Sequence, residues 1–91
     1  MSLDMREVAR TKLLTGPSKI LVLMYMGAKR KVDFIKAGLG ASTIYYNMLF
    51  LVEAGLVVKK NGEYVLTEKG VMLAKALLEC LLKAKDILGG L

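Results

Sequence analysis

The chain has 91 residues, enough for one compact domain with a small core, since a domain of this size buries only about 60–65 % of its unfolded surface. Hydrophobic residues make up 55 % of the chain, but charged residues interrupt the apolar runs, so no stretch reaches the roughly 20 apolar residues of a membrane span. The net charge of +6 suggests an anionic partner or, more simply, a solubilising surface, while one cysteine and no histidine exclude most zinc sites and an internal disulfide framework.

Two helices are predicted in the N-terminal third of the chain. Residues 3–14 carry apolar side chains at helical spacing, with charged side chains opposite them. Pro17 suits the first turn of a second helix over residues 18–26, which is apolar almost all round and ends at Gly27. This second helix is therefore expected to be buried on most sides.

A basic segment and a tight turn follow. Residues 28–32 are too few for more than one strand-like contact, and Asp33 is predicted to cap a short helix that ends at Ala37. Gly38 and Gly40 then supply the turn.

The next helix is predicted for residues 41–54. Apolar residues recur there at i, i+4 and i+7, which marks an inward stripe formed by Ile44, Met48 and Leu51. Gly55 is expected to end the helix, because glycine adopts the left-handed conformation without steric cost.

The hydrophobic period changes after this helix. Residues 56–66 form two β-rich runs joined by Asn61-Gly62, the strongest short-range hairpin signal. Thr67 is predicted to cap a final helix that reaches residue 88 and is about 30 Å long. The expected fold class is mainly α with a small β-hairpin, in a single domain over residues 1–91.

This order of elements resembles the winged helix-turn-helix domain of transcription regulators. The similarity is carried by LTGPSKILVLMYM, by GLGASTIYYNMLFLVEAGLV and by YVLTEKG, which together span residues 14–70. These motifs look like the MarR, PadR and ArsR group, particularly its small archaeal members. The resemblance implies a winged-helix core at residues 14–67 with a C-terminal dimerisation helix at residues 68–91.

The resemblance also implies sequence-dependent binding of a homodimer to double-stranded DNA. In such domains the helix after the turn lies in the major groove, and the wing, here about residues 56–66, contacts the backbone or the minor groove. Polar side chains that face outward or to the flanks of residues 41–54 are the candidate readers: Ser42, Thr43, Tyr45, Tyr46 and Asn47. Their hydroxyl and amide groups can bond base edges or phosphates.

Positive charge lies at both borders of this helix rather than on it. Six basic and two acidic residues fall between positions 29 and 60, which leaves four of the six net charges in this segment. The candidate phosphate-binding residues are Lys29, Arg30, Lys31, Lys36, Lys59 and Lys60. The ordinary alternative is that the lysines are solvated and the tyrosines are half-buried aromatics.

Apolar residues in the candidate recognition helix depart from the family pattern. Leu49 and Phe50 stand where polar or basic residues are usual, and an apolar patch more often marks a packing surface than a groove contact. The alternative function is therefore a winged-helix module that binds protein without reading DNA.

The final helix is predicted to form the dimer interface. Its charged residues lie in one narrow stripe, and an apolar seam runs opposite with the spacing of a helix pair. The predicted interface comprises Met5, Val8, Leu13, Ala74, Leu77, Leu81, Ala84 and Leu88. Cys80 is expected to be a small buried hydrophobe, with an intermolecular disulfide as the alternative if two copies cross antiparallel.

No residue pattern indicates an enzyme. Without histidine or paired carboxylates, the sequence offers no constellation of nucleophile, base and orienting group. We expect a cytoplasmic binding protein without metal or other cofactor, and the sequence specifies no small-molecule effector.

Overall fold

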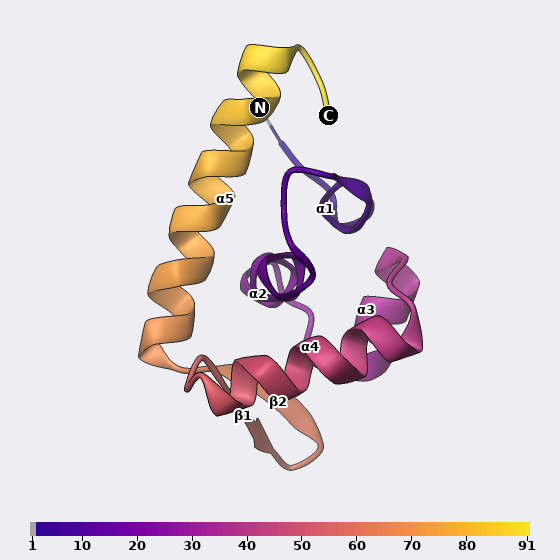
Figure 1. The fold of residues 1–91 in the computed structure, drawn as a ribbon, viewed down its shortest axis with the longest axis vertical. Helices are drawn as coiled ribbons and strands as arrows, with labels where there is room; N and C mark the ends of the chain where they lie inside the picture. The colour runs from indigo at the N-terminus through magenta and orange to yellow at the C-terminus, as the bar shows by residue number, and fades with distance from the viewer. Residues whose placement is uncertain (1) are drawn as a thin grey trace.

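The computed structural model describes residues 2–91 and contains helices arranged around α2, with a two-stranded wing at one end (Figure 1). The elements are α1 (Met5–Arg10), α2 (Gly16–Tyr25), α3 (Lys31–Ala37), α4 (Ala41–Glu53), β1 (Val57–Lys60), β2 (Glu63–Leu66) and α5 (Glu68–Leu88). Within this described part of the chain, no helix is long and apolar enough to cross a membrane. The architecture agrees with the predicted mainly α fold class with one hairpin.

Helix α1 is shorter than predicted and is fixed at its start by a capping box. Asp4 Oδ1 accepts the backbone N–H of Glu7 at 2.9 Å, and Glu7 Oε1 accepts that of Asp4 at 3.2 Å. The helix ends at Arg10 because Thr11 is extended and buried, which turns the chain toward α2. The predicted continuation to residue 14 is therefore wrong.

An ion pair ties α1 to the far end of α5. Lys85 Nζ lies 2.7 Å from Glu7 Oε2 and also donates to the backbone carbonyl of Ser2 at 2.9 Å. The Lys85 hydrogen bond, and then the backbone hydrogen bond from Asp4, hold the pKa of Glu7 below its ordinary value. This contact joins segments that are far apart in the sequence.

Helix α3 begins before the predicted cap. Arg30 occupies the N-cap position, and Asp33 lies in the first turn, where its Oδ2 accepts the N–H groups of Lys29 and Arg30 at 2.9 Å each. These two hydrogen bonds lower the pKa of Asp33. Asp33 is thus not the N-cap that was predicted, although it satisfies the backbone donors at this helix start.

Helix α4 begins at its predicted residue and ends at Glu53, one residue before the predicted end, and its stripe of Ile44, Met48 and Leu51 is buried. The wing begins after Gly55, whose φ of +75° lies in the left-handed region as expected. Positive φ angles at Asn61 and Gly62 make the tight hairpin turn that the sequence predicts.

Helix α5 is held against the start of the wing. Thr67 Oγ1 donates to the Gly55 carbonyl at 2.7 Å and accepts the Gly70 N–H at 3.1 Å, so it both caps α5 and closes the wing. A Cβ on Gly70 would lie only 2.1 Å from the carbonyl oxygen of Leu56. Glycine therefore permits the close approach of α5 to β1.

The face of α5 that packs on α2 contains much of the predicted dimer seam. Ala74 and Leu81 are buried within the protomer, as is Val8 of α1. These three residues are corrected from dimer contacts to core residues, because the seam opposite the charged stripe covers the protomer's own α2. Of the remaining predicted contacts, Met5, Leu77 and Ala84 are half-buried, and Leu13 and Leu88 are exposed.

Candidate nucleic-acid interface

The outward side of α4 forms an uncharged ridge that ends in one carboxylate. At 100° per residue from the buried Ile44, the side chains of Ser42, Tyr46, Leu49 and Glu53 point most directly away from the core. We call these four residues the outer ridge. All four are exposed, and Tyr46 retains 68 % of its accessible surface.

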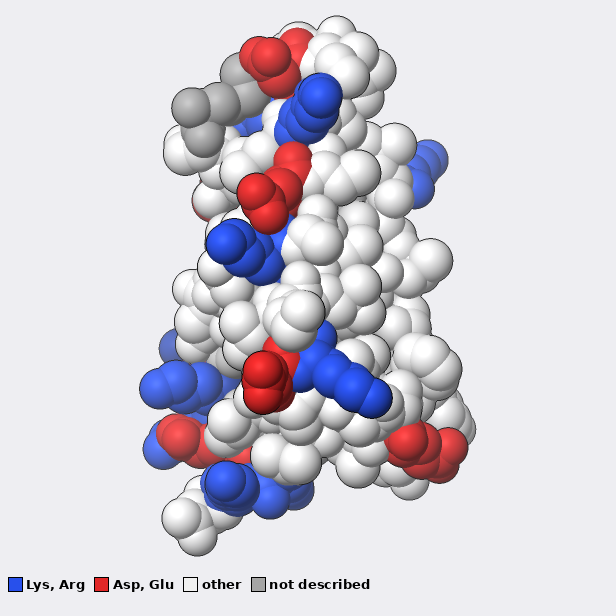
Figure 2. Space-filling model, turned by 90° about the vertical axis from the view of Figure 1, so that its left-hand side faces the viewer, with Lys and Arg blue, Asp and Glu red and all other residues white. Residues whose placement is uncertain are grey.

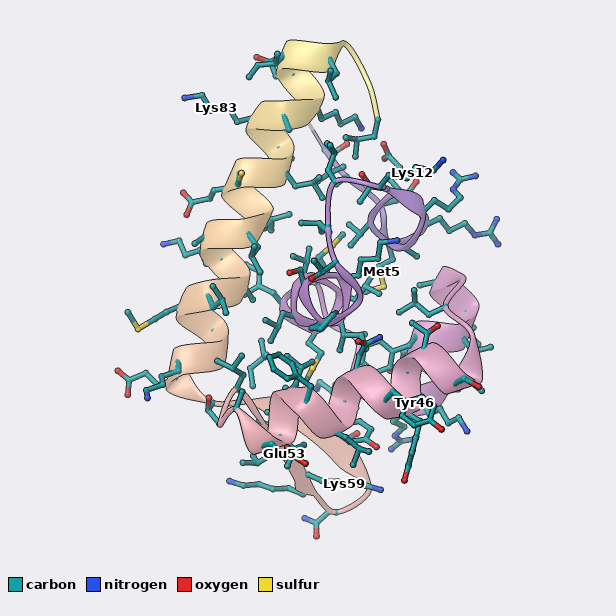
Figure 3. The ribbon with its side chains drawn as sticks, in the orientation of Figure 1. Met5, Lys12, Tyr46, Glu53, Lys59 and Lys83 are labelled. Atoms are coloured by element: carbon teal, nitrogen blue, oxygen red, sulfur yellow. The ribbon has the colours of Figure 1, made fainter. Side chains whose placement is uncertain are left out.

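The two tyrosines predicted to contact DNA, Tyr45 and Tyr46, are exposed and contact each other. The rings of Tyr45 and Tyr46 meet edge to face, with centroids 5.2 Å apart and planes at 77°. Tyr46 projects from α4 on the side of the molecule that carries Lys59 of the wing, whereas Lys12 and Lys83 lie at the opposite end (Figure 3). The two hydroxyls are thus available to an external partner.

Asn47 does not belong to the outward surface. Its Nδ2 donates to the Thr43 carbonyl at 2.7 Å, and its side chain lies against the start of α2, where a Cβ on Gly16 would be 2.5 Å from Nδ2. Asn47 is therefore corrected from a candidate reader to a contact between α4 and α2. Thr43 is exposed on the same flank of the helix.

Basic residues that are about 30 positions apart in the sequence converge on the wing. Lys59 pairs with Tyr64 in the hairpin, and the Tyr64 N–H donates to the Lys29 carbonyl at 2.8 Å, the single strand-like contact predicted for the basic segment. Arg30 Nε lies 3.3 Å from Glu63 Oε2. We call this group the wing cluster, and it consists of Lys29, Arg30, Lys31, Lys59 and Lys60.

The charges of the wing cluster are exposed to solvent and only partly neutralised. Glu63 pairs with Arg30, and Lys59 Nζ lies 5.4 Å from the centre of the Tyr64 ring in a cation–π contact. The other cations, on Lys29, Lys31 and Lys60, are exposed. Such an arrangement suits closely spaced phosphate groups.

Lys36 stands apart from this cluster. It lines a shallow surface groove together with Met5 and Arg6 of α1 and Asp33 of α3. The groove lies between α1 and α3, so Lys36 is not brought together with the wing, and its predicted place among the phosphate contacts is not supported by position.

Leu49 and Phe50 are uncovered in the protomer. Their exposed fractions are 45 % and 54 %. The outward surface of α4 is therefore a mixed one, with hydroxyl groups from Ser42 and Tyr46 beside apolar side chains.

A second exposed apolar surface, which was not predicted from the sequence, lies on α5. Leu73, Ala76, Cys80 and Ile87 are all exposed and follow one another at intervals of three, four and seven residues. We call these residues the α5 flank. The expectation that Cys80 is buried is wrong, because α2 covers the neighbouring face of the helix, where Ala74 and Leu81 lie. The spacing of seven residues from Leu73 to Cys80 and from Cys80 to Ile87 is the sequence pattern that could have predicted this second apolar surface.

Comparison with known proteins establishes the fold. No protein-family model matches the chain, and no curated protein matches it in sequence. Among solved structures, the crystal structure of SSV1 F-93 is similar with a TM-score of 0.69 and 24 % sequence identity, over 85 % of this chain and 97 % of that one. The similarity confirms the predicted winged-helix fold without supporting the MarR, PadR or ArsR group specifically.

Proposed function

We propose that the protein is a homodimeric transcription regulator that binds double-stranded DNA, and not an enzyme. In this proposal α4 enters the major groove and the wing contacts the backbone or the minor groove. The observation that supports it is the placement of the exposed Tyr46 and the wing's Lys59 on one side of the molecule (Figure 3).

The division of charge between α4 and the wing matches the two parts of a DNA contact. Cations of the wing cluster would neutralise phosphates and release counterions, which supplies affinity without sequence information. The outer ridge carries no cation and would approach base edges through the part of the helix that precedes its last turn, where Ser42, Tyr46 and Leu49 lie. Affinity and selectivity would therefore come from different elements.

A second copy of the chain is the proposed partner for the α5 flank. Figure 2 shows a stripe of charged side chains along the outer face of α5, with uncharged surface beside it. Leu73 and Ile87 are 41 % and 75 % exposed, which in a lone protomer leaves apolar area in water. Pairing these flanks would bury that area, and a two-fold dimer could set two α4 helices about 34 Å apart, one turn of duplex.

Salt-dependent binding tests the DNA-binding part of the proposal. We would measure fluorescence anisotropy of labelled duplex DNA for the wild-type protein and for the double variant Lys59→Ala, Lys60→Ala. Each phosphate contact contributes about 0.9 to the slope of log affinity against log salt, so the variant should bind more weakly with a shallower slope. The double variant Lys75→Ala, Lys83→Ala removes the same charge from the exposed stripe of α5 and should change the slope little.

A protein-binding module is the second candidate function. The exposure of Leu49 and Phe50 favours it, because apolar patches commonly mark protein interfaces. Absence of duplex binding at low salt would support this candidate and overturn the proposed DNA binding.

A further inference from the structure

The outer ridge lacks the groups that usually read G·C pairs. Guanine is most often recognised by a bidentate Arg or Lys, and the cytosine amino group by a carboxylate. No Arg or Lys occurs in α4, and the one carboxylate, Glu53, is at its C-terminal end. The N-terminal residues of a recognition helix are those that reach base edges, so Glu53 is poorly placed for cytosine.

The ridge does present an apolar group to the same surface. Leu49 follows Tyr46 by three positions, a spacing that places two side chains next to each other on a helix. The C5-methyl of thymine is the methyl group that B-DNA displays in the major groove, and apolar side chains contact it. Leu49 is exposed to water in the protomer. Contact with a thymine methyl would remove both the leucine side chain and the methyl group from water.

We propose that α4 selects A·T-rich duplexes by placing Leu49 against thymine C5-methyl groups, an inference that rests on the proposed DNA binding. The hydroxyls of Ser42 and Tyr46 bond polar atoms of neighbouring base edges, since a hydroxyl both donates and accepts. The Tyr46 ring meets the Tyr45 ring edge to face, and Leu49 lies about one turn further along the same face of the helix. The wing cluster supplies the phosphate contacts that bring this neutral surface into the groove.

Base analogues isolate the methyl group from all other features of the duplex. We would measure binding to an A·T-rich duplex of about 30 base pairs, long enough for two half-sites, and to the same duplex with uracil in place of thymine. A G·C-rich duplex and its 5-methylcytosine counterpart form the reverse pair, in which the methyl is added. Wild-type protein should bind the methylated member of each pair about fourfold more tightly for each methyl group contacted. This ratio corresponds to the free energy gained when one methyl-sized group is removed from water.

Substitutions then assign the effect to the ridge. Leu49→Ala should bind the two members of each pair equally, whereas Met72→Ala, a matched change at an exposed site on α5, should keep the wild-type ratio. The double variant Lys59→Ala, Lys60→Ala should weaken binding to all four duplexes and leave the ratios unchanged.

The outcomes separate this inference from the proposed function. Equal binding of wild-type protein to the thymine and uracil duplexes would overturn methyl recognition while DNA binding stands. Methyl discrimination that survives in Leu49→Ala would overturn the role of Leu49. Failure to bind any of the four duplexes at low salt would overturn the proposed function itself.

Discussion

Replacing Gly70 with alanine should destabilise the junction between α5 and the wing. The added Cβ would lie 2.1 Å from the Leu56 carbonyl oxygen, whereas ordinary contacts begin at 3.4 Å, and the obstacle is backbone that no side-chain rotation can move away. Forcing such a contact costs about 3 kcal/mol, at the upper end of overpacking. Alanine recovers about 1 kcal/mol of helix propensity relative to glycine. The free energy of unfolding should therefore fall by about 2 kcal/mol.

Thermal unfolding followed by circular dichroism measures this loss. For a domain of this size, about 2 kcal/mol corresponds to a decrease in Tm of about 10 °C. Gly40→Ala is the control, because Gly40 has an ordinary φ of −75° and no atom lies within 4 Å of its added Cβ. An unchanged or higher Tm for Gly70→Ala, with Gly40→Ala near wild type, would refute the reasoning that α5 and β1 are held together at this glycine.

Three further predictions concern the caps, the α2–α4 contact and the α5 flank. The pKa values of Glu7 and Asp33 are lowered in the folded state. Their ionised carboxylates therefore stabilise the fold above their unfolded pKa values of about 4, and this stabilisation is lost as the pH falls through the folded values. Glu7→Gln should make the Tm depend less on pH in this acid range, as measured by thermal melts at a series of pH values. Gly16→Ala should lower Tm, and Asn47→Ala should relieve most of that loss in the double variant, because the clash is with the Asn47 side chain. Leu73→Glu should shift the protein from dimer to monomer on a sizing column with little change in the circular dichroism spectrum, since this side chain is exposed in the protomer; a wild-type protein that elutes as a monomer would contradict the proposed dimer.

Local signals in the sequence predicted the elements well where one residue type has one strong conformational preference. Asn61-Gly62 predicted the hairpin turn because both residues tolerate positive φ, and Thr67 predicted the start of α5 because its hydroxyl satisfies an orphan N–H. The period of Ile44, Met48 and Leu51 predicted the inward face of α4. In each case the determining interaction lies within a few residues along the chain.

Choices that depend on long-range packing could not be predicted in the same way. Helix α5 has one apolar seam through Ala74 and Leu81 and another through Leu73 and Ile87, and periodicity alone cannot say which one meets α2. Asn47 has the chemistry of a base reader, yet the missing side chain of Gly16 creates the space that holds it against α2. Both outcomes are set by neighbours distant in sequence.

The two exposed apolar surfaces differ in chemistry, which is why they are assigned different partners. The α5 flank has heptad spacing and carries no hydroxyl, so a copy of the same helix can match it by packing alone. On α4, Leu49 follows the hydroxyl-bearing Tyr46 by about one turn, and Lys59 of the wing cluster lies on the same side of the molecule as Tyr46. A purely apolar partner would leave the exposed hydroxyls of α4 without hydrogen bonds. A major groove lined with thymine methyls, base-edge acceptors and flanking phosphates matches all three features together. If Leu73→Glu abolishes dimerisation and weakens DNA binding while Leu49→Ala leaves the dimer intact, the two surfaces act separately as this difference in chemistry requires.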